Sequence, residues 1–296
     1  MATIITDIKE KFRRGNICIQ LIYINVAVFV LVTFVEVLFR LFNRSLMGVV
    51  EWLELPASIT RLAMQPWSLF TYMFMHGGLL HILFNMLWLY GFGQLFLNFF
   101  SAKHLRGVYV LGGICGGVLY VLAYNLFPYF SPVVDYSFMV GASASVLAIV
   151  TATAYREPNY PLRLFLFGTV RLKYLALIAI GMDLLFITSG NAGGHIAHLG
   201  GALAGLAFAA GLARGTDATA WINRCLDAIG SIFSPKPRKP KMKVHYGTGR
   251  QADYDYNARK KAQNDEIDRI LDKLKKSGYE SLTTDEKKSL FDASKR

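Results

Sequence analysis

Long apolar segments alternate with short polar ones along most of this 296-residue chain. Several of the segments run for about 18 residues or more with few charges, which is typical of helices that span a membrane. The pattern therefore predicts an all-α membrane protein, a bundle of six transmembrane helices followed by a short helical tail. The predicted spans are about 16–42, 78–99, 108–127, 139–155, 174–186 and 194–212.

Basic residues mark alternate connections between these spans. Lys and Arg gather in the N-terminal arm 1–15, in the links after the second and fourth spans, and in the region after 213, but not in the links after the third and fifth spans. By the positive-inside rule, this alternation places both termini in the cytoplasm. The net charge of +12 is thus explained by topology and by attraction to the anionic lipid bilayer. No nucleic-acid-binding motif accompanies the charge, so we predict no nucleic-acid partner.

The segments outside the spans have their own patterns. The first long link, 43–66, combines apolar residues with acidic ones and Pro56, which favours a segment lying at the membrane interface. After the membrane domain 16–213, a Pro/Lys-rich stretch predicts a basic linker over 214–262. Helical spacing of apolar residues, a helix stop at Gly278 and a capping box at Thr283-x-x-Glu286 predict a helical hairpin over 263–296.

Four polar side chains fall near the start of three spans that run inward from the outer surface. They are Ser143 in the fourth span, His198 in the sixth, and His81 and Asn85 in the second. Polar residues inside a membrane are costly, so such a coincidence of depth favours function. The available chemistry is acyl transfer, since a serine hydroxyl needs an adjacent base and a histidine can supply one. No carboxylate lies at this depth in the three spans, and Asp183 in the fifth is only a possible orienting group, so the sequence favours a Ser–His dyad over a triad.

Other interpretations of these residues remain open at this point. Small residues such as Gly141 and the Gly201-x3-Gly205 pattern are common wherever membrane helices pack, and Ser143 itself could serve packing alone. The histidines His76, His81, His195 and His198 could suggest a metal site, but zinc usually needs three protein ligands with supporting carboxylates. The cysteines Cys18, Cys115 and Cys225 show no metal spacing and no disulfide framework. We therefore predict no metal and no cofactor.

Three motifs together resemble the rhomboid intramembrane serine proteases. They are His76-x4-His81-x3-Asn85, Gly141-x-Ser143 and Ala197-His198-Leu199-Gly200-Gly201-x3-Gly205, in that order along residues 10–213. The resemblance implies that Ser143 is the nucleophile and His198 the general base. It also implies that His81, Asn85 and the Ser143 backbone N–H stabilise the oxyanion, and that Gly141 shapes the turn before the nucleophile.

The resemblance further implies a serine endopeptidase that cuts membrane-anchored proteins within or near a transmembrane helix. Its expected partners are transmembrane protein substrates, and its expected location is the bacterial inner membrane. Ala144 and Leu147 replace a Gly and a Tyr that are common in the family, changes that bear on packing and substrate fit. One alternative is a non-cleaving rhomboid-like scaffold or chaperone that binds client helices. A small transporter is disfavoured, because no internal repeat is evident.

Overall fold

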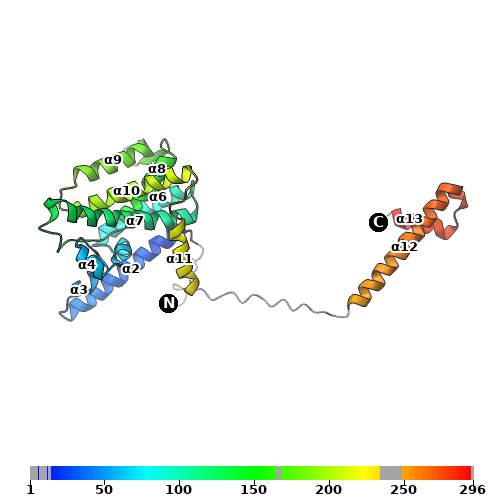
Figure 1. Cartoon of the computed structure of the whole chain (residues 1–296), viewed down its shortest axis with the longest axis horizontal. Coiled ribbons are helices and arrows are strands. Elements are labelled where there is room, and N and C mark those ends of the chain that lie inside the picture. Colours follow the sequence, from blue (N-terminus) through cyan, green and yellow to red (C-terminus); the bar gives the residue numbers. More distant parts are fainter. Residues whose placement is uncertain (1–5, 7–11, 13–14, 165–167, 234–248, 295–296) are drawn as a thin grey trace. The chain divides into compact units, whose positions relative to one another are not determined.

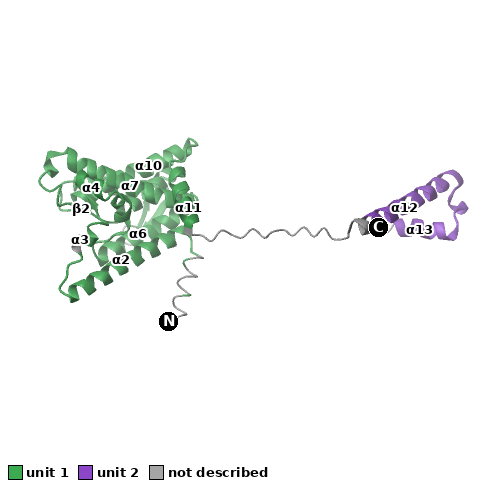
Figure 2. Ribbon diagram, turned by 60° about the horizontal axis from the view of Figure 1, so that its bottom comes forward, with its two compact units in different colours: residues 1–235 green, residues 236–296 purple. Residues whose placement is uncertain are grey.

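A computed structural model describes residues 6, 12, 15–164, 168–233 and 249–294. The chain divides into two compact units, residues 1–235 and 236–296 (Figures 1 and 2). The first unit holds the helices of the predicted membrane domain, and the second holds the predicted C-terminal hairpin. The N-terminal arm and the Pro/Lys-rich stretch 234–243 lie mostly or wholly outside the described residues.

Each predicted span corresponds to one helix of the first unit. Four of these helices are long and apolar enough to cross a membrane: α2 (Ile17–Leu41), α6 (Leu79–Leu97), α7 (Ala102–Leu126) and α10 (Ala192–Ala213). The other two, α8 (Ser143–Arg156) and α9 (Leu172–Leu185), have 14 residues each. At about 1.5 Å per residue such a helix is about 21 Å long, shorter than the hydrocarbon core of a bilayer. The fold is nevertheless an apolar helical bundle, as the sequence predicts.

The start of the fourth predicted span is not helical. Strand β2 (Phe138–Met139) pairs antiparallel with β1 (Leu55–Pro56), and helix α8 begins only at Ser143. The expectation that Ser143 lies about four residues inside a helix is therefore wrong. The cause is Gly141, whose φ of +131° lies in a region that L side chains rarely adopt and that a helix excludes.

The first long link is folded rather than featureless. It contains α3 (Met47–Val50), β1 and α4 (Ile59–Met64), and α5 (Ser68–Thr71) and a 3₁₀ turn η1 (Tyr72–Phe74) follow it. The indole rings of Trp52 and Trp67 stack with centroids 5.7 Å apart, and Trp67 Nε1 donates to the Trp52 carbonyl at 2.8 Å. These contacts tie the middle of the link to the residue that directly follows it.

Helices α7, α8 and α10 form the centre of the first unit (Figure 1). Glycines make the close packing possible, because any side chain at these positions would overlap a neighbouring helix. A Cβ on Gly201 would overlap the Ala144 carbonyl, and a Cβ on Gly205 would overlap that of Ala148. A Cβ on Gly116 of α7 would come within 2.7 Å of the Ala197 carbonyl oxygen. The fourth and sixth spans thus meet at small residues, a role in helix packing that fits the Gly201-x3-Gly205 pattern.

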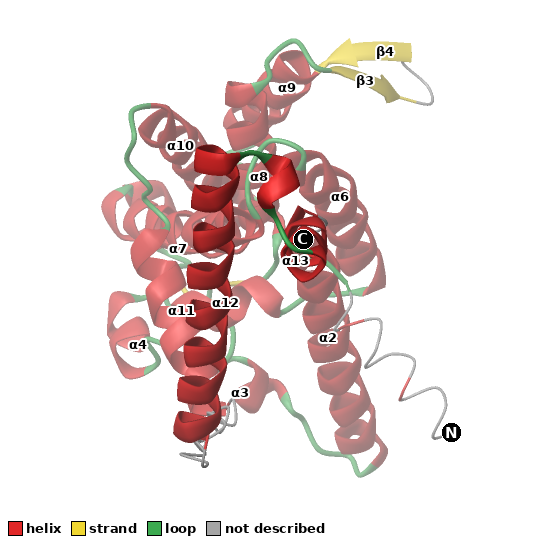
Figure 3. Cartoon of the chain, turned by 90° about the vertical axis from the view of Figure 1, so that its right-hand side faces the viewer, coloured by secondary structure: helices red, strands yellow, loops and turns green. Residues whose placement is uncertain are grey.

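Two further elements of the first unit were not expected. A β-hairpin, β3 (Pro161–Leu164) and β4 (Gly168–Arg171), precedes α9 (Figure 3). Helix α11 (Ala220–Phe233) occupies part of the predicted linker 214–262. It packs on α7, where the Arg106 guanidinium donates to Asn223 Oδ1 at 2.9 Å and to Asp227 Oδ1 at 2.8 Å. These polar contacts extend the membrane unit beyond 213.

The second unit is a helical hairpin of α12 (Gly249–Ser277), a 3₁₀ turn η3 (Tyr279–Ser281) and α13 (Thr284–Ser294). Helix α12 starts 14 residues before the predicted position of 263. The helix ends before Gly278 as predicted, and Gly278 has a φ of +76°. The capping box is also confirmed, since Glu286 Oε2 accepts from the Thr283 N–H at 2.9 Å and Thr283 Oγ1 accepts from the Glu286 N–H at 3.3 Å.

Candidate active site

Ser143 is the first residue of α8, and its side chain is partly exposed. The first intrahelical hydrogen bond runs from the Val146 N–H to the Ala142 carbonyl at 2.9 Å. The amides of Ser143, Ala144 and Ser145 therefore precede the helical ladder and are the unpaired donors of a helix N-terminus. Ser145, by contrast, is fully buried.

Gly141 lies where the second span comes close to Ser143. Its N–H donates to the Tyr72 carbonyl at 3.0 Å, which anchors the turn before α8. A Cβ on Gly141 would lie 2.9 Å from His81 Nε2 and 3.6 Å from Ser143 Oγ. The absence of a side chain thus lets the His81 ring approach the turn that carries Ser143.

His81 and Asn85 lie one turn apart on α6. The Asn85 side-chain amide donates to the His81 carbonyl at 2.9 Å, within its own helix. An amide group has two N–H donors, so this bond leaves a second donor for another acceptor. Asn85 is buried and His81 is partly buried, so any partner that they meet is largely shielded from solvent.

His198 lies on α10 against a carboxylate from α9. Its Nδ1 is 2.9 Å from Asp183 Oδ1, and the His195 Nδ1 is 2.8 Å from the same oxygen. The Asp183 side chain is 9% exposed, whereas the two histidine side chains are 21% and 23% exposed. The sequence favours a dyad without a carboxylate, and the structure differs by adding Asp183 to His198. Because Nδ1 of His198 faces Asp183, its Nε2 remains available for another partner.

One cavity of about 470 Å³ is lined by most of these groups, but not by Gly141 or His195. Its polar lining consists of His81, Asn85, Ser143, Asp183 and His198, which come from four helices. The remaining lining is apolar: Leu80, Phe84, Trp88, Val146, Leu147, Ala179 and Met182. The predicted convergence of the serine, the two histidines and the asparagine is therefore present. Within the described part of the chain, no hydrogen bond joins Ser143 Oγ to His198, and such bonds are often long before substrate binds.

The sequence did not assign His195 to a site, and it left Asp183 as an unsupported possibility. Asp183 lies on the fifth span, at a distance in sequence that no motif fixes. His195 precedes His198 by three residues, a spacing that places both rings on the same side of α10. With Asp183 they bring three ligand atoms within 4.8 Å of one another, so a carboxylate does support the histidines of the sixth span.

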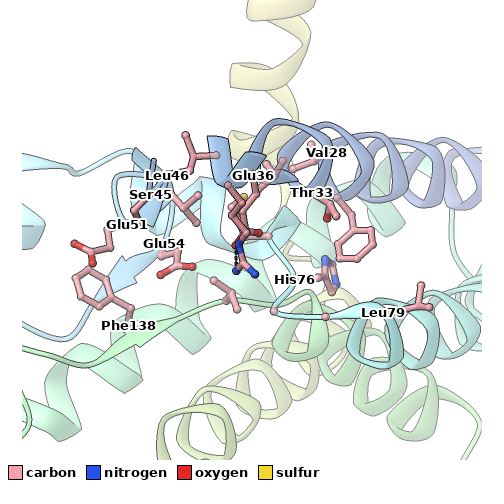
Figure 4. Close-up of a pocket in the computed structure, with 18 of the residues that line it drawn as sticks. Val28, Thr33, Glu36, Ser45, Leu46, Glu51, Glu54, His76, Leu79 and Phe138 are labelled. Carbon is pink, nitrogen blue, oxygen red and sulfur yellow. Dashed lines mark hydrogen bonds and ion pairs between the residues drawn. The ribbon is translucent and has the colours of Figure 1, made fainter. Parts of the chain in front are cut away.

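His76 lines a larger cavity of about 1120 Å³, whose other lining residues include ones from α2 and the first link (Figure 4). Its ring packs edge-on against His81 with centroids 5.1 Å apart. Neither buried ring nitrogen of His76 has a hydrogen-bond partner among the described residues. Burial, with a smaller contribution from His81, lowers the pKa of His76 to about 4.

Comparison with known proteins identifies the family of the first unit. The Rhomboid domain family matches residues 63–215, which leaves α2 outside the match, and a family of unknown function (DUF6576) matches residues 251–296. The RHOMBOID-like protein 12, mitochondrial, of Arabidopsis thaliana is 33% identical over 144 residues, which are 46% of this chain and 43% of that protein. The chain thus matches less than half of that relative's length. Since the Rhomboid domain covers just over half of the chain and contains the serine, the histidines and their cavity, this multi-pass membrane protein belongs to the rhomboid family.

Proposed function

We propose that this protein is an intramembrane serine endopeptidase, with Ser143 as nucleophile and His198 as general base. The observation that supports the proposal is the shared cavity, in which a serine at a helix N-terminus faces two histidines, an amide and a carboxylate between apolar walls. Packing alone does not require this set of polar groups in one place, and such groups are costly inside a bilayer.

In the proposed reaction, His198 Nε2 takes the proton from Ser143 Oγ as the oxygen attacks the substrate carbonyl carbon. The tetrahedral intermediate then collapses, the peptide C–N bond breaks, and His198 returns the proton to the leaving amine. Water, activated by the same imidazole, hydrolyses the acyl-enzyme and restores the serine. Asp183 acts as a positioning residue, because its carboxylate accepts from His198 Nδ1–H and holds the tautomer that leaves Nε2 as acceptor.

The oxyanion donors of this proposal are the Ser143 backbone N–H, the His81 ring and the second N–H of Asn85. The His81 ring supports this role because its Nε2 lies close to Gly141 and hence to Ser143. A larger residue at Gly141 would push the ring away. Donors of this kind lower the barrier most when they are fixed before the reaction and shielded from water.

The proposed substrates are membrane-anchored proteins cleaved within or near a transmembrane helix. Leu80, Phe84 and Met182 line the cavity yet remain more than 45% exposed, so the cavity has an apolar rim on α6 and α9. An apolar rim suits a segment that arrives from the lipid. With the basic links facing the cytoplasm of a bacterial inner membrane, the cavity would lie toward the outer surface.

A fluorophosphonate probe tests the proposal without a known substrate. The full chain in mild detergent should be labelled, whereas Ser143→Ala and His198→Ala should not. Ser145→Ala is the matched control, because Ser145 is buried two residues away and should leave labelling intact. Failure of the folded wild type to react would remove the proposed activity and favour the alternative, a non-cleaving scaffold that binds client helices.

A further inference from the structure

One carboxylate oxygen of this protein is shared between two imidazoles. Asp183 Oδ1 contacts Nδ1 of His195 at 2.8 Å and Nδ1 of His198 at 2.9 Å. The proposed proteolysis uses one of these imidazoles and gives no role to the other. His195 therefore needs a separate explanation, and the shared oxygen supplies one.

We propose that Asp183, His195 and His198 form a binding site for a divalent transition-metal cation of the zinc type. We further propose that the bound cation blocks the protease, a consequence that rests on the proposed function. Two imidazole nitrogens and a carboxylate oxygen are a ligand set that zinc takes in proteins, with a fourth position left for water.

The geometry needs little change to admit the ion. The three ligand atoms already lie within 4.8 Å of one another. Zinc bonds of about 2.0–2.1 Å in a tetrahedral arrangement separate the ligand atoms by about 3.3 Å. The carboxylate oxygen would move away from each nitrogen by about 0.5 Å, and the two nitrogens, at most 4.8 Å apart, would approach each other by up to about 1.5 Å, changes that rotation of the three side chains can provide. Both histidine side chains are more than 20% exposed, so an ion can reach them.

The bonding of imidazole explains why a cation here would stop catalysis. A neutral imidazole carries one N–H and one lone pair on its two ring nitrogens. Without metal, the N–H is at Nδ1 of His198 against Asp183, and Nε2 holds the lone pair that accepts the Ser143 proton. A cation on Nδ1 takes that lone pair instead, so the hydrogen must be on Nε2. His198 then donates at Nε2 and can no longer act as the base.

Zinc binding is tested first, independently of proteolysis. The full chain carrying Ser143→Ala, stripped with a chelator, is dialysed against Zn²⁺ at defined free concentrations. We expect about one tightly bound zinc per chain, weakened at least about tenfold by adding either His195→Asn or Asp183→Asn. The control is His104→Asn. His104 Nε2 lies 3.6 Å from Asp217 Oδ2 elsewhere in the unit, so this substitution should leave zinc affinity unchanged. Absence of stoichiometric binding, or binding that is indifferent to His195 and Asp183, overturns the site.

The blocking role is tested by fluorophosphonate labelling of Ser143 with and without zinc, at a free concentration that occupies the wild type but lies well below the dissociation constant measured for His195→Asn. Each protein is compared with itself, so changes in basal rate cancel. Zinc should slow labelling of the wild type at least about tenfold and reversibly, whereas His195→Asn should show a ratio close to one. Zinc that binds without slowing the wild type refutes the block. A wild type that never labels refutes the proposed protease while the dialysis result still decides the cation site.

Discussion

Gly201 offers the sharpest test of how the fold positions the candidate site. It lies three residues after His198, and its backbone packs directly on Ala144, the residue after Ser143. A Cβ at this position would overlap the Ala144 carbonyl oxygen and lie 2.8 Å from the carbonyl carbon. Carbon atoms pack best at about 3.5–4.0 Å, so Gly201→Ala must separate α10 from α8 by about 1 Å.

That displacement should lower the reactivity of Ser143 more than it lowers the stability of the fold. Overpacking of this size destabilises a protein by about 1–3 kcal/mol. A 1 Å misplacement of a catalytic group can lower the rate by about a hundredfold. We therefore expect Gly201→Ala to remain folded while the fluorophosphonate labelling rate of Ser143 falls about a hundredfold. Labelling rate and thermal unfolding in detergent, measured on the same samples, separate the two effects.

The matched control is Gly91→Ala on α6, where an added Cβ would meet nothing within 4 Å. Alanine is favoured over glycine in a helix, so this variant should be as stable as the wild type or slightly more so. A Gly201→Ala protein that reacts and unfolds like the wild type would refute the close approach of α8 and α10. Loss of folding in Gly91→Ala would show instead that the assay reports on any helix substitution.

Three further predictions follow from the site and the tail. His81→Ala and Asn85→Ala should each lower the labelling rate by about ten- to a thousandfold, the cost of one oxyanion donor; wild-type rates in both would exclude them. The pKa of His76 is about 4 in the folded state, below its ordinary value of 6.5. Between these two pH values the unfolded state binds more protons than the folded state. The free energy of unfolding should therefore fall as the pH drops from about 6.5 to about 4. His76→Phe should flatten this decline in the unfolding temperature, and an unchanged slope would contradict the assignment. Deletion of residues 249–296 should leave labelling intact, since the candidate site lies wholly in the first unit; a folded but unreactive truncation would show that the tail is required.

Much of the candidate site could be predicted because its residues lie on short local motifs. His81 and Asn85 are four residues apart on one helix, and Gly141 and Ser143 are two residues apart in one turn. Such spacings fix relative position within an element whatever the rest of the fold does. The sequence also located His198, since it lies in an apolar span at about the same depth as Ser143 and His81 and carries the Ala197-His198-Leu199-Gly200-Gly201 motif. The capping box at Thr283 was predictable for the same local reason.

By itself, the sequence determined the apolar helical architecture, the approximate positions of the helices along the chain and the glycines at which the fourth and sixth spans pack. The tertiary structure alone decided which carboxylate meets His198, because Asp183 belongs to a separate helix and no sequence spacing encodes that distance. It also decided that Ser143 begins its helix, since Gly141 adopts a φ of +131° that excludes a helical turn there, and the presence of a glycine alone does not encode that conformation. Local periodicity in the sequence determines where helices and strands form, whereas long-range packing determines which partners a buried polar group meets.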